Sequence, residues 1–79
     1  MITVLRAHGL RVVIFADDHE PAHVHVFGDG HAKINLVSAE GGPALMWAEQ
    51  MTKGEVRRAF KTVVENRTML LRRWSEIHG

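Results

Sequence analysis

The chain has 79 residues, of which 46% are hydrophobic and 24% charged, a composition that fits one folded domain and excludes both disorder and a second hydrophobic core. It contains no cysteine, so disulfide bonds and thiolate metal sites are excluded and only His, Asp or Glu remain as metal ligands. The net charge is +1. The sequence has no apolar run of about 18 residues and no secretory signal pattern. We therefore expect residues 1–79 to form a single soluble, cytoplasmic domain with no membrane partner.

The first predicted element is a β-hairpin over residues 2–16. This stretch is rich in apolar and β-branched residues and is interrupted by His8 and Gly9, which predicts a two-residue turn. The turn places Arg6 directly opposite Arg11, on the face away from the apolar side chains. Two arginines in this position repel each other unless an anion lies between them, so we predict both as nucleic-acid-binding residues.

A second hairpin follows over residues 23–37, and the length of its loop decides where the histidines point. A two-residue loop would mix polar and apolar side chains on both faces. A three-residue loop from Gly28 to Gly30, with Gly30 in the left-handed conformation, pairs Val24 with Ile34 and makes one face wholly apolar. This register is therefore predicted. The residues that it places on the opposite face are His23, His25, His31, Lys33 and Asn35.

The remaining residues predict a short strand at 44–47 and a helical segment at about 53–78. Thr52 is expected to cap the helix, with Glu55 completing a capping box. Apolar residues recur at helical spacing from Val56 to Ile77, but Arg67 falls within the apolar stripe. Either the helix bends or breaks there, or Arg67 is buried against a carboxylate or a partner. We favour the bend or break, because an unpaired buried charge is costly.

These elements together predict a two-layer α+β fold. A small antiparallel sheet over residues 2–47, built from two hairpins and the possible short strand, is covered on one face by C-terminal helix. The helical part is basic: residues 52–79 carry seven basic and three acidic side chains, against three and six in residues 1–51. A phosphate backbone would be attracted to this part. The nucleic-acid-binding residues predicted on the helix are Arg57, Arg58, Lys61 and Arg72.

The stretch DHEPAHVHV, residues 18–26, contains three of the six histidines and is the main candidate site. We predict His23, His25 and Lys33 as catalytic residues of metal-free acid–base chemistry on a phosphodiester. His-x-His spacing on a strand also occurs in metal sites, with a third ligand from Asp18, His19, Glu20 or His31. The pattern fixes no carboxylate in that role, so we rank a metal last and predict no cofactor. The histidines can also be exposed surface residues, or one of them can satisfy backbone groups in the preceding loop.

Nearly the whole chain resembles a family of bacterial proteins, the domain-of-unknown-function family DUF4160. The segments that carry the resemblance are TVLRAHGLRVVIF, DHEPAHVHV, AKINL, TKGEV and VVENRTMLLRRW, in that order. Its most specific motif covers Pro21, His23 and His25, with Lys33 and Asn66 as weaker matches. The chain departs from the family in having Glu20-Pro21-Ala22 where many members have a double proline.

The resemblance implies a small cytoplasmic protein, often encoded beside a DUF2442 protein in an arrangement similar to toxin–antitoxin modules. We therefore expect a component of such a module that acts on RNA or DNA, with RNA cleavage by the His/Lys sheet face as its activity and a DUF2442 protein as its partner. The first alternative is a non-catalytic regulatory module that binds protein or nucleic acid through the basic helix. The second is a small metal-binding enzyme.

Overall fold

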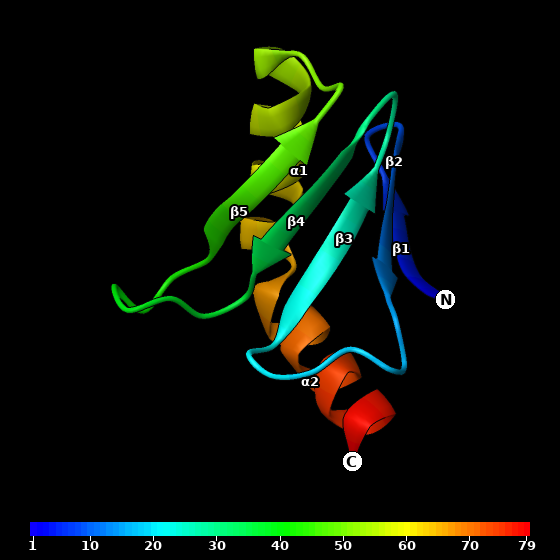
Figure 1. Cartoon of the computed structure of the whole chain (residues 1–79), viewed down its shortest axis with the longest axis vertical. Coiled ribbons are helices and arrows are strands. Elements are labelled where there is room, and N and C mark those ends of the chain that lie inside the picture. Colours follow the sequence, from blue (N-terminus) through cyan, green and yellow to red (C-terminus); the bar gives the residue numbers. More distant parts are fainter.

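The computed structural model describes residues 1–79 and has an α+β fold, as the sequence predicts. Five antiparallel strands form one open sheet in the order β1-β2-β3-β4-β5, followed by two helices. The elements are β1 (Ile2–Ala7), β2 (Leu10–Ile14), β3 (His23–Phe27), β4 (His31–Asn35), β5 (Ala44–Glu49), α1 (Lys53–Glu65) and α2 (Arg67–His78). Both helices lie behind the sheet in Figure 1, so the face of the sheet that points toward the viewer is free of helices. We call it the open face.

The first hairpin has the predicted two-residue turn between β1 and β2. Both turn residues have positive φ, 55° for His8 and 75° for Gly9, which matches the twist of a tight hairpin. Arg6 pairs with Arg11 across the two strands, as predicted. The two arginines are therefore neighbours on the open face.

The second hairpin, β3 and β4, has the predicted three-residue loop from Gly28 to Gly30, with His25 opposite Lys33. The prediction that Gly30 is left-handed is wrong, because Gly30 does not have a positive φ. Glycine is required there for a different reason: a Cβ atom at Gly30 would collide with the backbone carbonyl oxygen of Glu49 at the end of β5. The missing side chain allows the loop and β5 to approach each other closely.

The predicted short strand is present as β5 and extends two residues beyond Trp47. It forms one edge of the sheet and pairs with β4, so that Trp47 lies opposite Lys33. All residues of β5 except Ala44 are exposed. Trp47 consequently stands on the open face, next to the strand that carries Lys33.

Helix α1 begins as predicted, but its capping box is only half formed. The Thr52 hydroxyl accepts a hydrogen bond from the Glu55 backbone N–H, at 3.1 Å. The Glu55 carboxylate does not bond back to the cap; it accepts instead from the backbone N–H of Asp29, at 2.9 Å. Glu55 is buried, so this bond ties the start of the helix to the β3–β4 loop.

The predicted break in the helical segment occurs at Asn66, whose φ of −115° and ψ of 15° end α1 and start α2. The Arg67 guanidinium is also hydrogen-bonded, to two backbone carbonyls rather than to a carboxylate. Its Nε donates to the Leu36 carbonyl at 2.7 Å, and its Nη2 donates to the Gly41 carbonyl at 2.7 Å. The guanidinium thus attaches the start of α2 to the β4–β5 connection.

The core lies between the helices and the covered face of the sheet. Its buried apolar side chains are Leu10, Val12, Ile14, Val24, Val26, Ile34, Leu36, Ala59, Val63, Leu70 and Trp74. Val64, expected on the apolar stripe, is 48% exposed, whereas Thr62 is fully buried and bonds to the Arg58 carbonyl. Neither helix is long and apolar enough to cross a membrane.

Candidate histidine site on the open sheet face

The strand register positions the residues that the sequence predicts as catalytic. His23 and His25 project from β3 on the side opposite Val24, which is fully buried in the core. Lys33 lies on β4 directly across from His25. The structure therefore brings His25 and Lys33 together, and it places His23 at the first residue of β3, beside the loop that connects β2 to β3.

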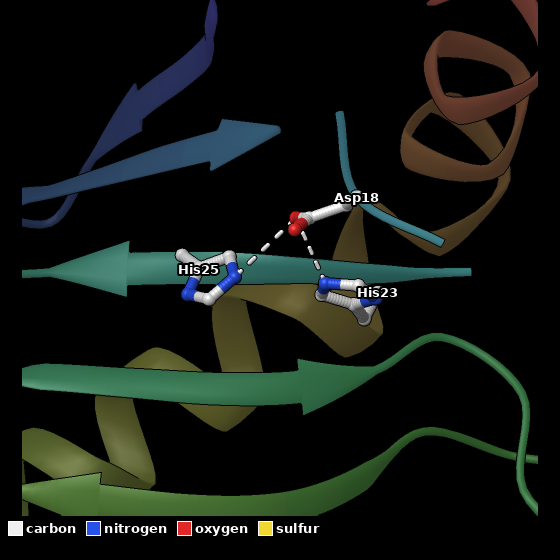
Figure 2. Close-up of side chains that lie close together, drawn as sticks. All are labelled: Asp18, His23 and His25. Carbon is white, nitrogen blue, oxygen red and sulfur yellow. Dashed lines mark hydrogen bonds and ion pairs between the residues drawn. The ribbon is translucent and has the colours of Figure 1, made fainter. Parts of the chain in front are cut away.

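Asp18, in that connecting loop, joins the two histidines. Figure 2 shows its carboxylate over the start of β3, between the two imidazole rings. Asp18 Oδ2 lies 2.9 Å from His23 Nε2 and 3.5 Å from His25 Nε2. One nitrogen or oxygen atom from each of the three residues lies within 4.8 Å of the others. Among the side chains that the sequence offers as a third ligand, Asp18 is the one in this group.

His23 is buried, with only 3% of its surface exposed. Its Nδ1 lies 2.9 Å from the Pro21 carbonyl oxygen, and because a carbonyl only accepts hydrogen bonds, Nδ1 must carry a proton. The ring also packs against Trp74, with centroids 5.1 Å apart. Both nitrogens of His23 have protein partners, the Pro21 carbonyl and the Asp18 carboxylate.

His25 is more accessible than His23, with 12% of its side chain exposed. Its Nδ1 lies 2.9 Å from His31 Nε2, so one proton links the two rings. Burial lowers the pKa of His25 from its ordinary value of 6.5. The charge of Asp18 acts in the opposite direction, whereas those of His23, His31 and Lys33 lower the pKa further. Asp18, His23, His25 and His31 together form what we call the histidine cluster.

Aromatic rings extend the histidine cluster across the open face. His31 stacks on Phe27, with ring centroids 4.1 Å apart and planes inclined by 17°. The edge of His31 also meets Trp47, at 4.8 Å and 82°. Trp47 is 37% exposed, and its ring lies 6.1 Å from that of His25. The open face therefore presents flat aromatic groups beside ionisable ones.

Arg6 and Arg11 contribute to a shallow pocket next to these rings. The pocket has a volume of about 720 Å³ and lies at the end of the first hairpin. Its lining residues are Arg6, Ala7, His8, Gly9, Leu10, Arg11, Phe27, Gly28 and Asp29. The Arg11 guanidinium lies 5.2 Å from the centre of the Phe27 ring, within the range of a cation–π contact. Phe27 thus connects the arginine pair to His31.

The predicted nucleic-acid-binding residues of the helices belong to the other layer of the molecule. These residues, all exposed, are Arg57, Arg58, Lys61 and Arg72. Arg58 reaches the first hairpin, where its Nε donates to the His8 carbonyl at 3.2 Å. The helices that carry these cations lie behind the sheet (Figure 1), whereas the histidine cluster lies on the open face.

The sequence does not single out Asp18, His31 or Trp47 as a site residue. Asp18 was one of several possible third ligands, and only its place in the DHEPAHVHV stretch pointed to it. His31 was placed on the correct face without a catalytic role. Trp47 lies beside the histidines because it pairs opposite Lys33, a contact between strands β4 and β5 that the sequence does not specify.

A comparison with protein-family models identifies the family. The model of the family described as Domain of unknown function (DUF4160) matches residues 9–75. The chain belongs to the DUF4160 family. The matched range includes the whole histidine cluster and Lys33. Neither the curated proteins nor the solved structures compared with the chain include a match.

Proposed function

We propose that this DUF4160 chain binds single-stranded nucleic acid on the open face of its sheet. The observation that carries the proposal is the basic and aromatic surface around Arg11, which pairs with Arg6 and lies over the Phe27 ring. Lys33 and the exposed Trp47 continue this surface across β4 and β5. Cationic side chains bind the phosphates of a single strand, and aromatic rings stack on its splayed bases, as on the sheets of known RNA-binding modules.

The charges on this face set the expected strength of binding. Three cations, Arg6, Arg11 and Lys33, make about three phosphate contacts, which corresponds to a slope of about −2 for log K against log salt concentration. Binding of this kind has a dissociation constant of about 1–100 μM at physiological salt. The interaction should therefore be measurable by fluorescence anisotropy at low salt and weaken steeply as salt is added.

The decisive experiment compares charge reversal on the two layers of the molecule. Arg11→Glu changes the open face, and Arg57→Glu is the matched control on the exposed side of α1. We expect Arg11→Glu to weaken binding of a labelled single strand by tenfold or more, roughly the effect of losing one contact and adding a repulsion, with little change for Arg57→Glu. The opposite pattern would favour the basic helix as the binding surface, and no binding by the wild type at low salt would refute the proposal. RNA and DNA strands of one sequence distinguish the two polymers.

Cleavage of a bound RNA strand is a second candidate function, supported by the position of Lys33 opposite His25. The linked imidazoles of His25 and His31 accept the proton of a ribose 2′-hydroxyl as its oxygen attacks the phosphorus. They return a proton to the 5′-oxygen that leaves, and the products are a 2′,3′-cyclic phosphate and a free 5′-hydroxyl. Lys33 stabilises the negative charge that develops on the phosphate. His23 contributes by holding Asp18.

Expression in bacteria tests cleavage and the toxin–antitoxin hypothesis together. We expect wild-type protein to slow growth and fragment transcripts, and His25→Ala or Lys33→Ala to abolish both effects. His19→Ala is the control, because His19 is exposed and outside the histidine cluster. Circular dichroism shows that each variant is folded. Equal growth and intact RNA with all proteins would reject cleavage while leaving strand binding untouched. In such a module, co-expression of the predicted DUF2442 partner should relieve the growth defect.

A further inference from the structure

We propose that Asp18, His23 and His25 form a binding site for a divalent transition-metal ion, with Zn²⁺ as the expected occupant. The proposed ligand atoms are Asp18 Oδ2 and the Nε2 atoms of the two histidines. From the sequence we rank a metal site last, because the His-x-His pattern does not determine which carboxylate would be the third ligand. In the structure Asp18, in the β2–β3 loop, lies in that position.

The hydrogen bonds of His23 direct its Nε2 at the Asp18 carboxylate. Nδ1 of His23 carries a proton, because its partner is the Pro21 carbonyl. Its Nε2 lies only 2.9 Å from Asp18 Oδ2. Two acceptors do not face each other at this distance unless a proton or a metal ion lies between them. The His23 ring is buried and held by the Pro21 carbonyl, so its Nε2 is positioned for a metal ion in place of that proton.

One ligand atom from each of the three residues lies within 4.8 Å of the others, close to the spacing of three ligands around one ion. With bonds of about 2.0–2.1 Å in a tetrahedral site, neighbouring ligand atoms lie about 3.3 Å apart. Asp18 Oδ2 and His25 Nε2 already lie 3.5 Å apart. The 2.9 Å between Asp18 and His23 needs to open by a few tenths of an ångström, roughly what a small rotation of the partly buried Asp18 side chain provides.

The outer partners of the rings are those of metal-bound histidines. A ligating imidazole usually donates its other N–H to a carbonyl, carboxylate or similar acceptor, which fixes its orientation. His23 does so to Pro21, and His25 has His31 Nε2 at 2.9 Å from its Nδ1. Two imidazoles and one carboxylate favour zinc or a similar first-row ion over Mg²⁺ and Ca²⁺, which prefer oxygen ligands. Three protein ligands leave the fourth position for water or a substrate oxygen.

The metal site does not depend on the proposed strand binding, which uses different side chains. The metal site does affect the second candidate function, RNA cleavage. An ion bound to His25 Nε2 would occupy one of the nitrogens that could accept or donate the proton in that reaction. If RNA cleavage continues in the presence of a chelator, the imidazoles catalyse it without a metal ion. If cleavage disappears on chelation and returns with Zn²⁺, the metal-bound protein is the active form. Metal binding itself is measured without RNA.

The experiment uses the full chain without an affinity tag, freed of metal with a chelator. Calorimetric titration with Zn²⁺ should give one ion per chain, and Co²⁺ should produce the visible absorption of a four- or five-coordinate site with nitrogen ligands. Asp18→Asn and His25→Gln retain the size of the side chain and should weaken binding by about 100-fold or more. The matched controls make the same changes at the exposed residues on either side of Asp18. They are Asp17→Asn and His19→Gln, which should bind Zn²⁺ as the wild type does.

The wild-type measurements decide the proposal even if a variant does not fold. Absence of a one-to-one zinc complex in the wild type, or a Co²⁺ spectrum of an ion with only water ligands, would overturn it. Unchanged affinity in both folded cluster variants would also overturn it, because the ion would then bind elsewhere. Loss of binding in Asp18→Asn and His25→Gln, with normal binding in the two controls, would support the three-residue site.

Discussion

Replacing Arg67 with alanine should lower the free energy of unfolding by about 2–4 kcal/mol. The Nε bond to the Leu36 carbonyl is partly buried, and a hydrogen bond with a charged donor contributes about 1.5–3 kcal/mol in such a place. The Nη2 bond to Gly41 is exposed and adds less, roughly 1 kcal/mol or under. The total is a large part of the about 4–12 kcal/mol expected for a domain of this size.

Urea unfolding followed by far-ultraviolet circular dichroism measures this loss. Arg72→Ala is the matched control, because it makes the same change in the same helix at an exposed position, so helix propensity cancels. The control should stay within about 0.5 kcal/mol of the wild type. Hydrogen exchange of backbone amides near Ser38 and Gly41 should also become faster in Arg67→Ala, since the connection loses its attachment to α2. Equal stability of the two variants would refute the reasoning.

Three further substitutions test the packing of the sheet. Gly30→Ala should cost about 1–3 kcal/mol in urea unfolding, because its Cβ would meet the Glu49 backbone, whereas Gly42→Ala, with open space around it, should be nearly neutral. Val24→Asp should prevent folding, as judged by circular dichroism, because it places a carboxylate in a fully buried position. His25→Ala should cost about 1–2 kcal/mol in the same urea assay, because the ring is largely enclosed. A tolerated Val24→Asp would show that the strand register is wrong.

The strands and their registers could be predicted because they depend on information that is local in the chain. Alternation of apolar residues decides which face of a strand is buried, and His8-Gly9 and the Gly28–Gly30 loop set the pairing of each hairpin. Thr52 similarly marks the start of α1. The same reasoning placed His25 opposite Lys33, which is the geometric basis of the candidate site.

The contacts made by loops and side-chain ends were decided only by the tertiary structure. Glu55 has the spacing of a capping box, yet its carboxylate bonds to Asp29, because packing of α1 on the sheet brings that N–H within its range. Asp18 became the partner of the histidines, and His23 became buried, through the path of the β2–β3 loop against α2. Periodicity carries no information about such contacts, since they join residues whose separation in space depends on how the two layers pack.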